Sequence, residues 1–140
     1  MFTRAVRGWH LGRSLSHSLS LTALNKALAH SKPEIHHSDQ DVQYAATTYV
    51  ACLTQAGTQV SMSDPGQPTQ NAYAERFMRT FKEEHFDYTE YADFDDAYRQ
   101  IKHWIEVEYT AERIHSSLGY LTPSEFEAAY HSRVNLLISP

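Results

Sequence analysis

The feature that most constrains the fold is the alternation of short strand-like segments with longer helix-like ones. Loosely alternating apolar residues predict a strand over residues 3–11, and short apolar segments predict two more, over 34–38 and 58–62. Helices are predicted between these strands, the first opening at Ser18 or Ser20 and the second at Thr47 or Thr48. A third is predicted over residues 70–84, after the turn-forming cluster at 64–68. This order is typical of an α/β layered domain with a partly parallel sheet.

Two more helices are predicted in the rest of the chain. Asp93 stands where it can cap a helix whose apolar stripe runs from Phe94 to Ile105, and a last short helix is predicted over residues 124–130. The hydrophobic fraction of 41% favours a globular fold over disorder. No segment approaches the roughly 20 apolar residues that a membrane span needs, so no membrane association is expected.

The charge distribution leaves a nucleic-acid partner open. The net charge of −5 argues against an isolated nucleic-acid-binding domain. However, five cationic residues and no acid precede Glu34. Such a basic segment suggests a face that tolerates phosphate, although a merely solvated face is the alternative.

Two carboxylates stand out by their positions. Asp39 directly follows a predicted strand, Glu75 lies in the first turns of a predicted helix, and 35 residues separate them. Strand ends and helix starts hold side chains accurately, and two converging carboxylates suit Mg²⁺, which prefers oxygen ligands. A turn-forming role for Asp39 and a surface role for Glu75 are the alternative.

The neighbours of Glu75 extend this hypothesis. Arg79 and Lys82 follow Glu75 at i+4 and i+7, so the three share one helix face, where the cations can hold DNA phosphates without reading sequence. An ordinary Glu–Arg helix pair is the alternative. His36 and His37 point to opposite faces of an extended segment, which disfavours a shared zinc site.

Four segments, in order along the chain, resemble the DDE transposases of bacterial insertion sequences. Residues 36–44 look like the segment around the second catalytic aspartate of that family, and residues 65–77 resemble the segment that bears its catalytic glutamate. Residues 2–9 resemble the end of its first strand and its second strand, and residues 109–123 resemble its C-terminal signature. The interval between Asp39 and Glu75 is also that family's spacing.

The resemblance implies an RNase H-like integrase core with a mixed sheet and flanking helices. Residues 1–109 are expected to form the core and residues 110–140 its C-terminal tail. The implied activity is metal-dependent cleavage of transposon-end DNA and its joining to target DNA, with Mg²⁺ or Mn²⁺ held by Asp39 and Glu75. The expected DNA contacts are Gln70, Asn71, Arg76, Arg79 and Lys82.

The family also implies partners and a location. DNA is the expected partner, as transposon ends and as target, together with a second copy of the chain or a full-length transposase. A bacterial cytoplasmic protein is expected, associated with the nucleoid when bound to DNA. The single cysteine, Cys52, excludes an intrachain disulfide and fits that compartment.

Two departures from the family pattern matter. The family's first aspartate lies two residues before the position of Phe2, hence before Met1, and the first strand that carries it is expected to be missing with it. Asp41 stands where the family has glycine, and aspartate is among the residues that tolerate the left-handed backbone a glycine there suggests.

Three functional hypotheses follow. The chain is an enzyme whose missing aspartate comes from an upstream frame or a partner chain; or it is a non-catalytic remnant that binds DNA or a transposase; or it is an unrelated α/β interaction domain with structural carboxylates. The missing aspartate favours the second over the first for this chain alone, and the four motifs disfavour the third. A missing central strand also predicts open sheet edges and marginal stability.

Overall fold

The computed structural model describes residues 2–14, 16–64 and 68–138. The helices and strands belong to two compact units, Arg7–Thr89 in one and Met1–Val6 with Glu90–Pro140 in the other. Both the predicted strands after residue 33 and the predicted helices are present, so the α/β class is confirmed. Within the described residues, no helix is both long enough and apolar enough to cross a membrane.

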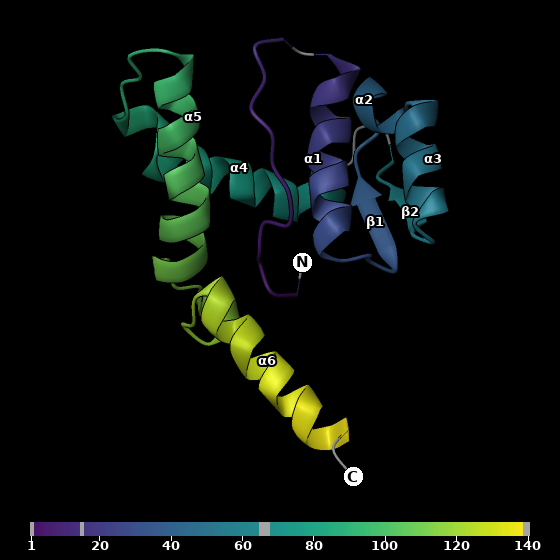
Figure 1. Ribbon diagram of the computed structural model, residues 1–140, viewed down its shortest axis with the longest axis vertical. Helices are drawn as coiled ribbons and strands as arrows, with labels where there is room; N and C mark the ends of the chain where they lie inside the picture. The colour runs from purple at the N-terminus through teal and green to yellow at the C-terminus, as the bar shows by residue number, and fades with distance from the viewer. Residues whose placement is uncertain (1, 15, 65–67, 139–140) are drawn as a thin grey trace. The chain divides into compact units, whose positions relative to one another are not determined.

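The unit Arg7–Thr89 is built around two parallel strands. Helix α1 (His17–His30) precedes strand β1 (Ile35–Ser38), and helices α2 (Val42–Ala45) and α3 (Thr47–Gln55) connect β1 to strand β2 (Gln59–Met62) (Figure 1). The register pairs His36 with Val60 and His37 with Ser61. Parallel strands require such a crossover connection, and here the two helices supply it.

One face of this small sheet is covered by helices. Leu24 of α1 and Tyr49 and Leu53 of α3 form a buried cluster, and Val60 of β2 packs against it. Leu53 is completely buried. Burial of these apolar side chains is the main term that holds the helices to the sheet.

The strand predicted over residues 3–11 is absent, so that prediction is wrong. Residues 7–12 run as irregular backbone beside α1: the Lys26 ammonium donates to the Trp9 carbonyl oxygen at 3.2 Å and lies 5.6 Å from the indole centroid. A Cβ at Gly8 would collide with backbone atoms of Ala23 and Ala27, so glycine permits this close approach. Alternating apolar residues form a strand only beside another strand, and the neighbour here is a helix.

The unit ends with the helix that carries Glu75. A 3₁₀ turn, η1 (Pro68–Asn71), leads into helix α4 (Ala72–Glu84), which is followed by a second 3₁₀ turn, η2 (Phe86–Tyr88). The helix predicted over residues 70–84 is therefore confirmed, with its regular part starting at Ala72.

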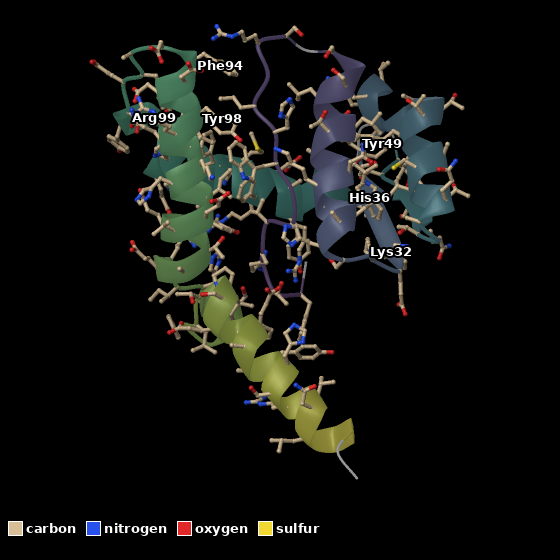
Figure 2. The ribbon with its side chains drawn as sticks, viewed as in Figure 1. Lys32, His36, Tyr49, Phe94, Tyr98 and Arg99 are labelled. Atoms are coloured by element: carbon tan, nitrogen blue, oxygen red, sulfur yellow. The ribbon has the colours of Figure 1, made fainter. Side chains whose placement is uncertain are left out.

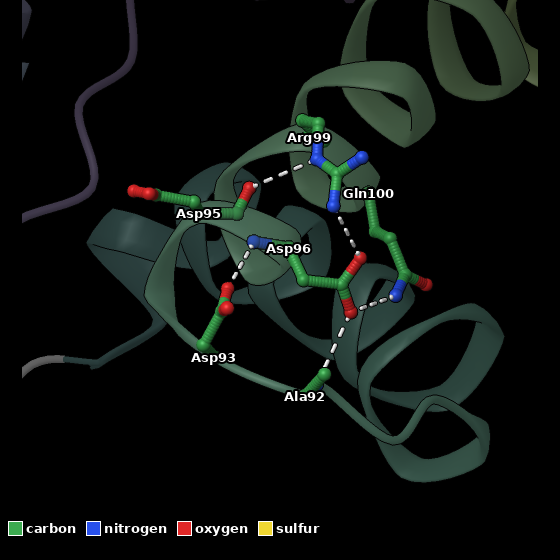
Figure 3. A network of polar contacts seen from close by, with 6 residues as sticks. All are labelled: Ala92, Asp93, Asp95, Asp96, Arg99 and Gln100. Carbon is green, nitrogen blue, oxygen red and sulfur yellow. Dashed lines mark hydrogen bonds and ion pairs between the residues drawn. The ribbon is translucent and has the colours of Figure 1, made fainter.

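The other unit contains helix α5 (Phe94–His103), the π-helical segment η3 (Trp104–Glu112), the short turn η4 (Ser116–Leu118) and helix α6 (Pro123–Ile138). The predicted cap of α5 is confirmed, because the Asp93 carboxylate accepts from the Asp96 N–H at 2.8 Å (Figure 3). The Asp96 carboxylate in turn accepts from the Ala92 N–H and from Gln100 and pairs with Arg99. These contacts, that of Ala92 foremost, lower the pKa of Asp96.

Helix α6 extends well beyond the predicted range of 124–130. Its start is a capping box: the Glu125 N–H donates to Thr122 Oγ1 at 3.2 Å, and the Thr122 N–H donates to the Glu125 carboxylate at 2.8 Å. Pro123 occupies the first helical position, where its missing N–H costs nothing. The ring of Phe2 packs edge-on against Phe126 of this helix, with centroids 5.0 Å apart.

Candidate active site

The first element of the site is Asp39, at the carboxyl end of β1. The Ser63 N–H donates to the Ser38 carbonyl oxygen at 2.9 Å, so the ladder between the two strands reaches the residue before Asp39. Asp39 Oδ1 then accepts from the Asp41 N–H at 3.1 Å. This local turn fixes the carboxylate at the end of a paired strand.

The second element is Asn71, the last residue before α4. Its side chain makes no hydrogen bond to the helix start, although asparagine often caps helices. Instead, Asn71 Nδ2 donates to Asp39 Oδ2 at 3.3 Å. The start of α4 is thereby joined to the end of β1 by residues 32 positions apart.

Glu75 lies one turn further along α4. Four residues correspond to a rise of about 6 Å, so Glu75 follows Asn71 on the same side of the helix. Its side chain is exposed and sits in the first turn, where the helix dipole stabilises a negative charge.

The cations predicted to contact DNA are exposed on α4. Arg79 and Lys82 lie on the face of Glu75, one and two turns further along, whereas Arg76 is adjacent in sequence and points to another side. The side chain of Gln70 lies outside the described part of the chain, as do residues 65–67. A DNA strand along this face would have its phosphates within reach of Arg79 and Lys82.

His36 and His37 lie on opposite faces of the sheet, as the period of a strand predicts. On the helix-covered face, Tyr49 Oη lies 3.3 Å from His36 Nε2 (Figure 2). On the other face, the two ring nitrogens of His37 lie 2.9 Å from Ser61 Oγ and 3.1 Å from Ser63 Oγ. Burial, and secondarily the neighbouring His37, lower the pKa of His36.

Comparison with known proteins decides the family. Two models described as integrase core domain match residues 56–123 and residues 1–68, in succession along the chain. The transposase of insertion sequence IS904 from Lactococcus lactis is 33% identical over 130 residues, covering 91% of this chain and 51% of that protein. This chain belongs to the integrase core family of insertion-sequence transposases.

Further relatives agree with this membership. The uncharacterized 31 kDa protein of insertion element IS600 from Shigella sonnei is 34% identical over 94% of this chain and 49% of its own length. Transposase InsF of IS3A from Escherichia coli K12 is 31% identical over 91% of this chain and 45% of its own length. The integrase core chain thus spans about half the length of the curated relatives it matches.

The donor set of this integrase core fits a hard divalent cation. Asp39 and Glu75 offer only oxygen ligands, and each Asp39 oxygen that accepts a hydrogen bond keeps a second lone pair. Within residues 2–14, 16–64 and 68–138, no three His, Cys, Asp or Glu side chains gather closely enough to hold a metal ion. Two carboxylates are a ligand number that Mg²⁺ accepts when phosphate oxygens complete its shell.

Three features of this site were not predicted from the sequence. The bond from Asn71 to Asp39 was not foreseen, and no local pattern reports a contact between residues so far apart in sequence. The pairing of His37 with two serines was also missed, although Ser61 and Ser63 alternate on one face of the second strand. The third feature is the raised pKa of Tyr44. Burial first, and then the charges of Asp39 and Asp41, raise this pKa, so the Tyr44 hydroxyl keeps its proton beside these carboxylates.

The structure also corrects the expectation for Asp41. Its backbone has φ −59° and ψ 143°, which any residue can adopt. The left-handed conformation that the family's glycine suggested at this position is therefore not used, and aspartate costs no backbone strain here.

Proposed function

We propose that the chain supplies two carboxylates, Asp39 and Glu75, to a metal-dependent site that cleaves transposon-end DNA and joins it to target DNA. The observation that supports this most is the hydrogen bond from Asn71 to Asp39, because it ties the start of the helix bearing Glu75 to the strand end bearing Asp39. Relatives over nearly all of the chain are named transposases, which agrees with that reaction class.

Each residue has a definite task in this proposal. Asp39 and Glu75 would hold Mg²⁺ or Mn²⁺, and a metal held there would supply Lewis-acid polarisation of the phosphodiester and activation of the attacking hydroxyl group. Asn71 keeps the Asp39 carboxylate in one orientation through its N–H donor. Arg79 and Lys82 hold the phosphates of the strand that passes Glu75, with Arg76 and Gln70 as further contacts.

A metal-binding experiment with the 140-residue chain tests the proposal. We expect Mn²⁺, followed by the loss of its free-ion electron paramagnetic resonance signal, to bind at one main locus. Asp39→Asn and Glu75→Gln should each remove that binding, because each deletes a charged ligand from a pair. Glu106→Gln is the matched control, since Glu106 is an exposed acid on η3. Equal Mn²⁺ binding by all four proteins would reject the assignment.

A non-catalytic DNA-binding module is the second candidate. The row of exposed cations on α4 favours it, because those side chains can hold phosphate without any metal. The same variants separate the two: a chain that binds DNA with unchanged affinity in Asp39→Asn, and takes up no Mn²⁺, supports the module and rejects the metal site. A protein partner, either a second copy or a full-length transposase, is compatible with both candidates.

A further inference from the structure

The helix that carries Glu75 also forms one wall of an open groove of about 650 Å³. Its apolar lining consists of Met78 and Phe81 of α4 and Phe86 of η2. Met78 and Phe86 are 58% and 53% exposed, so the apolar surface is accessible within this unit. The ring centroids of Phe81 and Phe86 lie 6.3 Å apart with their planes inclined by 41°.

The charges around the groove are ordered along the chain. Arg79 and Lys82 line the part that follows Glu75 by one and two helical turns, whereas the acids Glu83 and Asp87 come later. Lys82 and Glu83 are adjacent, so the cations attract a polyanionic backbone along the turns that follow Glu75, and Asp87 of η2, beyond the end of α4, repels it. An occupant that suits this order has its phosphate near the cations and an uncharged, planar part over the aromatic rings.

The spacing from Glu75 sets where on a DNA strand such an occupant would lie. Lys82 stands about 10 Å along the helix axis from Glu75. A nucleotide advances about 3.4 Å in a stacked strand and more when unstacked. The groove is thus roughly two or three nucleotides from a phosphate held beside Glu75. Its volume lies in the range of about 300–1,000 Å³ that is usual for small-molecule sites.

We propose that this groove takes up one unpaired base of the DNA strand that reacts beside Glu75, roughly two or three nucleotides from the reacting phosphate. The proposal rests on the proposed DNA-cleaving function and adds a substrate feature to it: the strand is unpaired roughly two or three nucleotides from the reacting phosphate. The base stacks on Phe86 and Phe81, Met78 contacts its edge, and Arg79 and Lys82 hold the phosphates on either side. Stacking on aromatic rings tolerates any base, so the groove selects unpairing and not sequence.

Fluorescence anisotropy with the 140-residue chain, without metal, tests this. The probes are a short blunt duplex and the same duplex with a single-stranded end containing 2-aminopurine. We expect tighter binding of the probe with the unpaired end, and a change in 2-aminopurine fluorescence on binding. Phe86→Ala should weaken binding of that probe by about 5- to 150-fold, the loss expected for one stacked base, and leave the blunt duplex unchanged.

The chain offers a matched control for that substitution. Tyr88 belongs to the same 3₁₀ turn, is 84% exposed and does not line the groove, so Tyr88→Ala should bind both probes as the parent does. Phe86→Tyr should retain the preference, because the tyrosine ring also stacks. Lys82→Ala should weaken both probes, since a phosphate contact is common to them.

The outcomes separate this inference from the function on which it rests. Equal affinity for the two probes, or a Phe86→Ala protein that keeps the preference, overturns the groove assignment and leaves the proposed function standing. Failure to bind either probe overturns the proposed function itself. A Phe86→Ala protein whose sedimentation coefficient falls while its DNA affinity is unchanged shows that the groove holds a second copy of the chain, which also overturns the inference.

Discussion

Replacing Asn71 by alanine is expected to weaken divalent metal binding without unfolding the chain. Asn71 touches the proposed metal ligand Asp39 through one hydrogen bond of 3.3 Å, slightly longer than the usual range of about 2.7–3.2 Å. A bond to a charged acceptor contributes about 1.5–3 kcal/mol, and a long bond of a half-buried side chain stands at the low end of that range. A loss of about 1.4 kcal/mol corresponds to about tenfold in affinity, the lower limit for residues that orient metal ligands.

The assay is an Mn²⁺ titration of Asn71→Ala beside the parent chain, with urea unfolding of both proteins. Asn25→Ala is the control, because Asn25 on α1 also has a side-chain hydrogen bond of 3.3 Å, accepted from the Cys52 thiol, and that bond does not involve Asp39. We expect Asn71→Ala to lose about tenfold in affinity and Asn25→Ala to lose none. An unchanged affinity in Asn71→Ala, with an intact fold, would refute the reasoning that this bond orients Asp39.

Four further predictions concern the chain itself. Burial lowers the pKa of His36 below 6.5, so the folded state takes up a proton at His36 less readily than the unfolded state. The free energy of unfolding, measured by urea titration at a series of pH values, should therefore fall as pH decreases from 6.5 towards the folded-state pKa, and His36→Gln should flatten that part of the series. Thr122→Ala removes the capping box of α6 and should lower the free energy of unfolding, measured by urea titration, by about 1 kcal/mol. Thr122→Ser should retain most of this stability, because its hydroxyl can still cap the helix. With Mg²⁺ and transposon-end DNA, the 140-residue chain alone should show no end cleavage or strand transfer, because two carboxylates leave a two-metal site short of ligands. Metal-dependent cleavage that disappears in Asp39→Ala would contradict this prediction. The two described strands pair only with each other, and their open edges predict a thermal midpoint below about 55 °C and association at high concentration; a higher midpoint with a retained monomer would oppose it.

The sequence by itself determined the features that depend on neighbours in the chain. The cap at Asp93, the helix over residues 70–84 after its turn-forming cluster, and the strands ending at Ser38 and Met62 were all predicted, because capping, helical period and backbone restriction act within a few residues. The opposite faces of His36 and His37 followed in the same way from the period of a strand. The positions of Asp39 and Glu75 at element ends followed from these elements, and their pairing at one metal stays a prediction.

Only the tertiary structure decided what depends on distant contacts. Residues 3–11 have the pattern of a strand, but a strand exists only when another strand accepts its hydrogen bonds, and residues 7–12 lie against helix α1. Asn71 has the sequence position of a helix cap, yet its amide reaches Asp39 because folding brings the start of α4 to the end of β1. In both cases a local hydrogen bond competes with a contact that forms only after folding brings distant residues together. The sequence pattern carries no information about that distant contact.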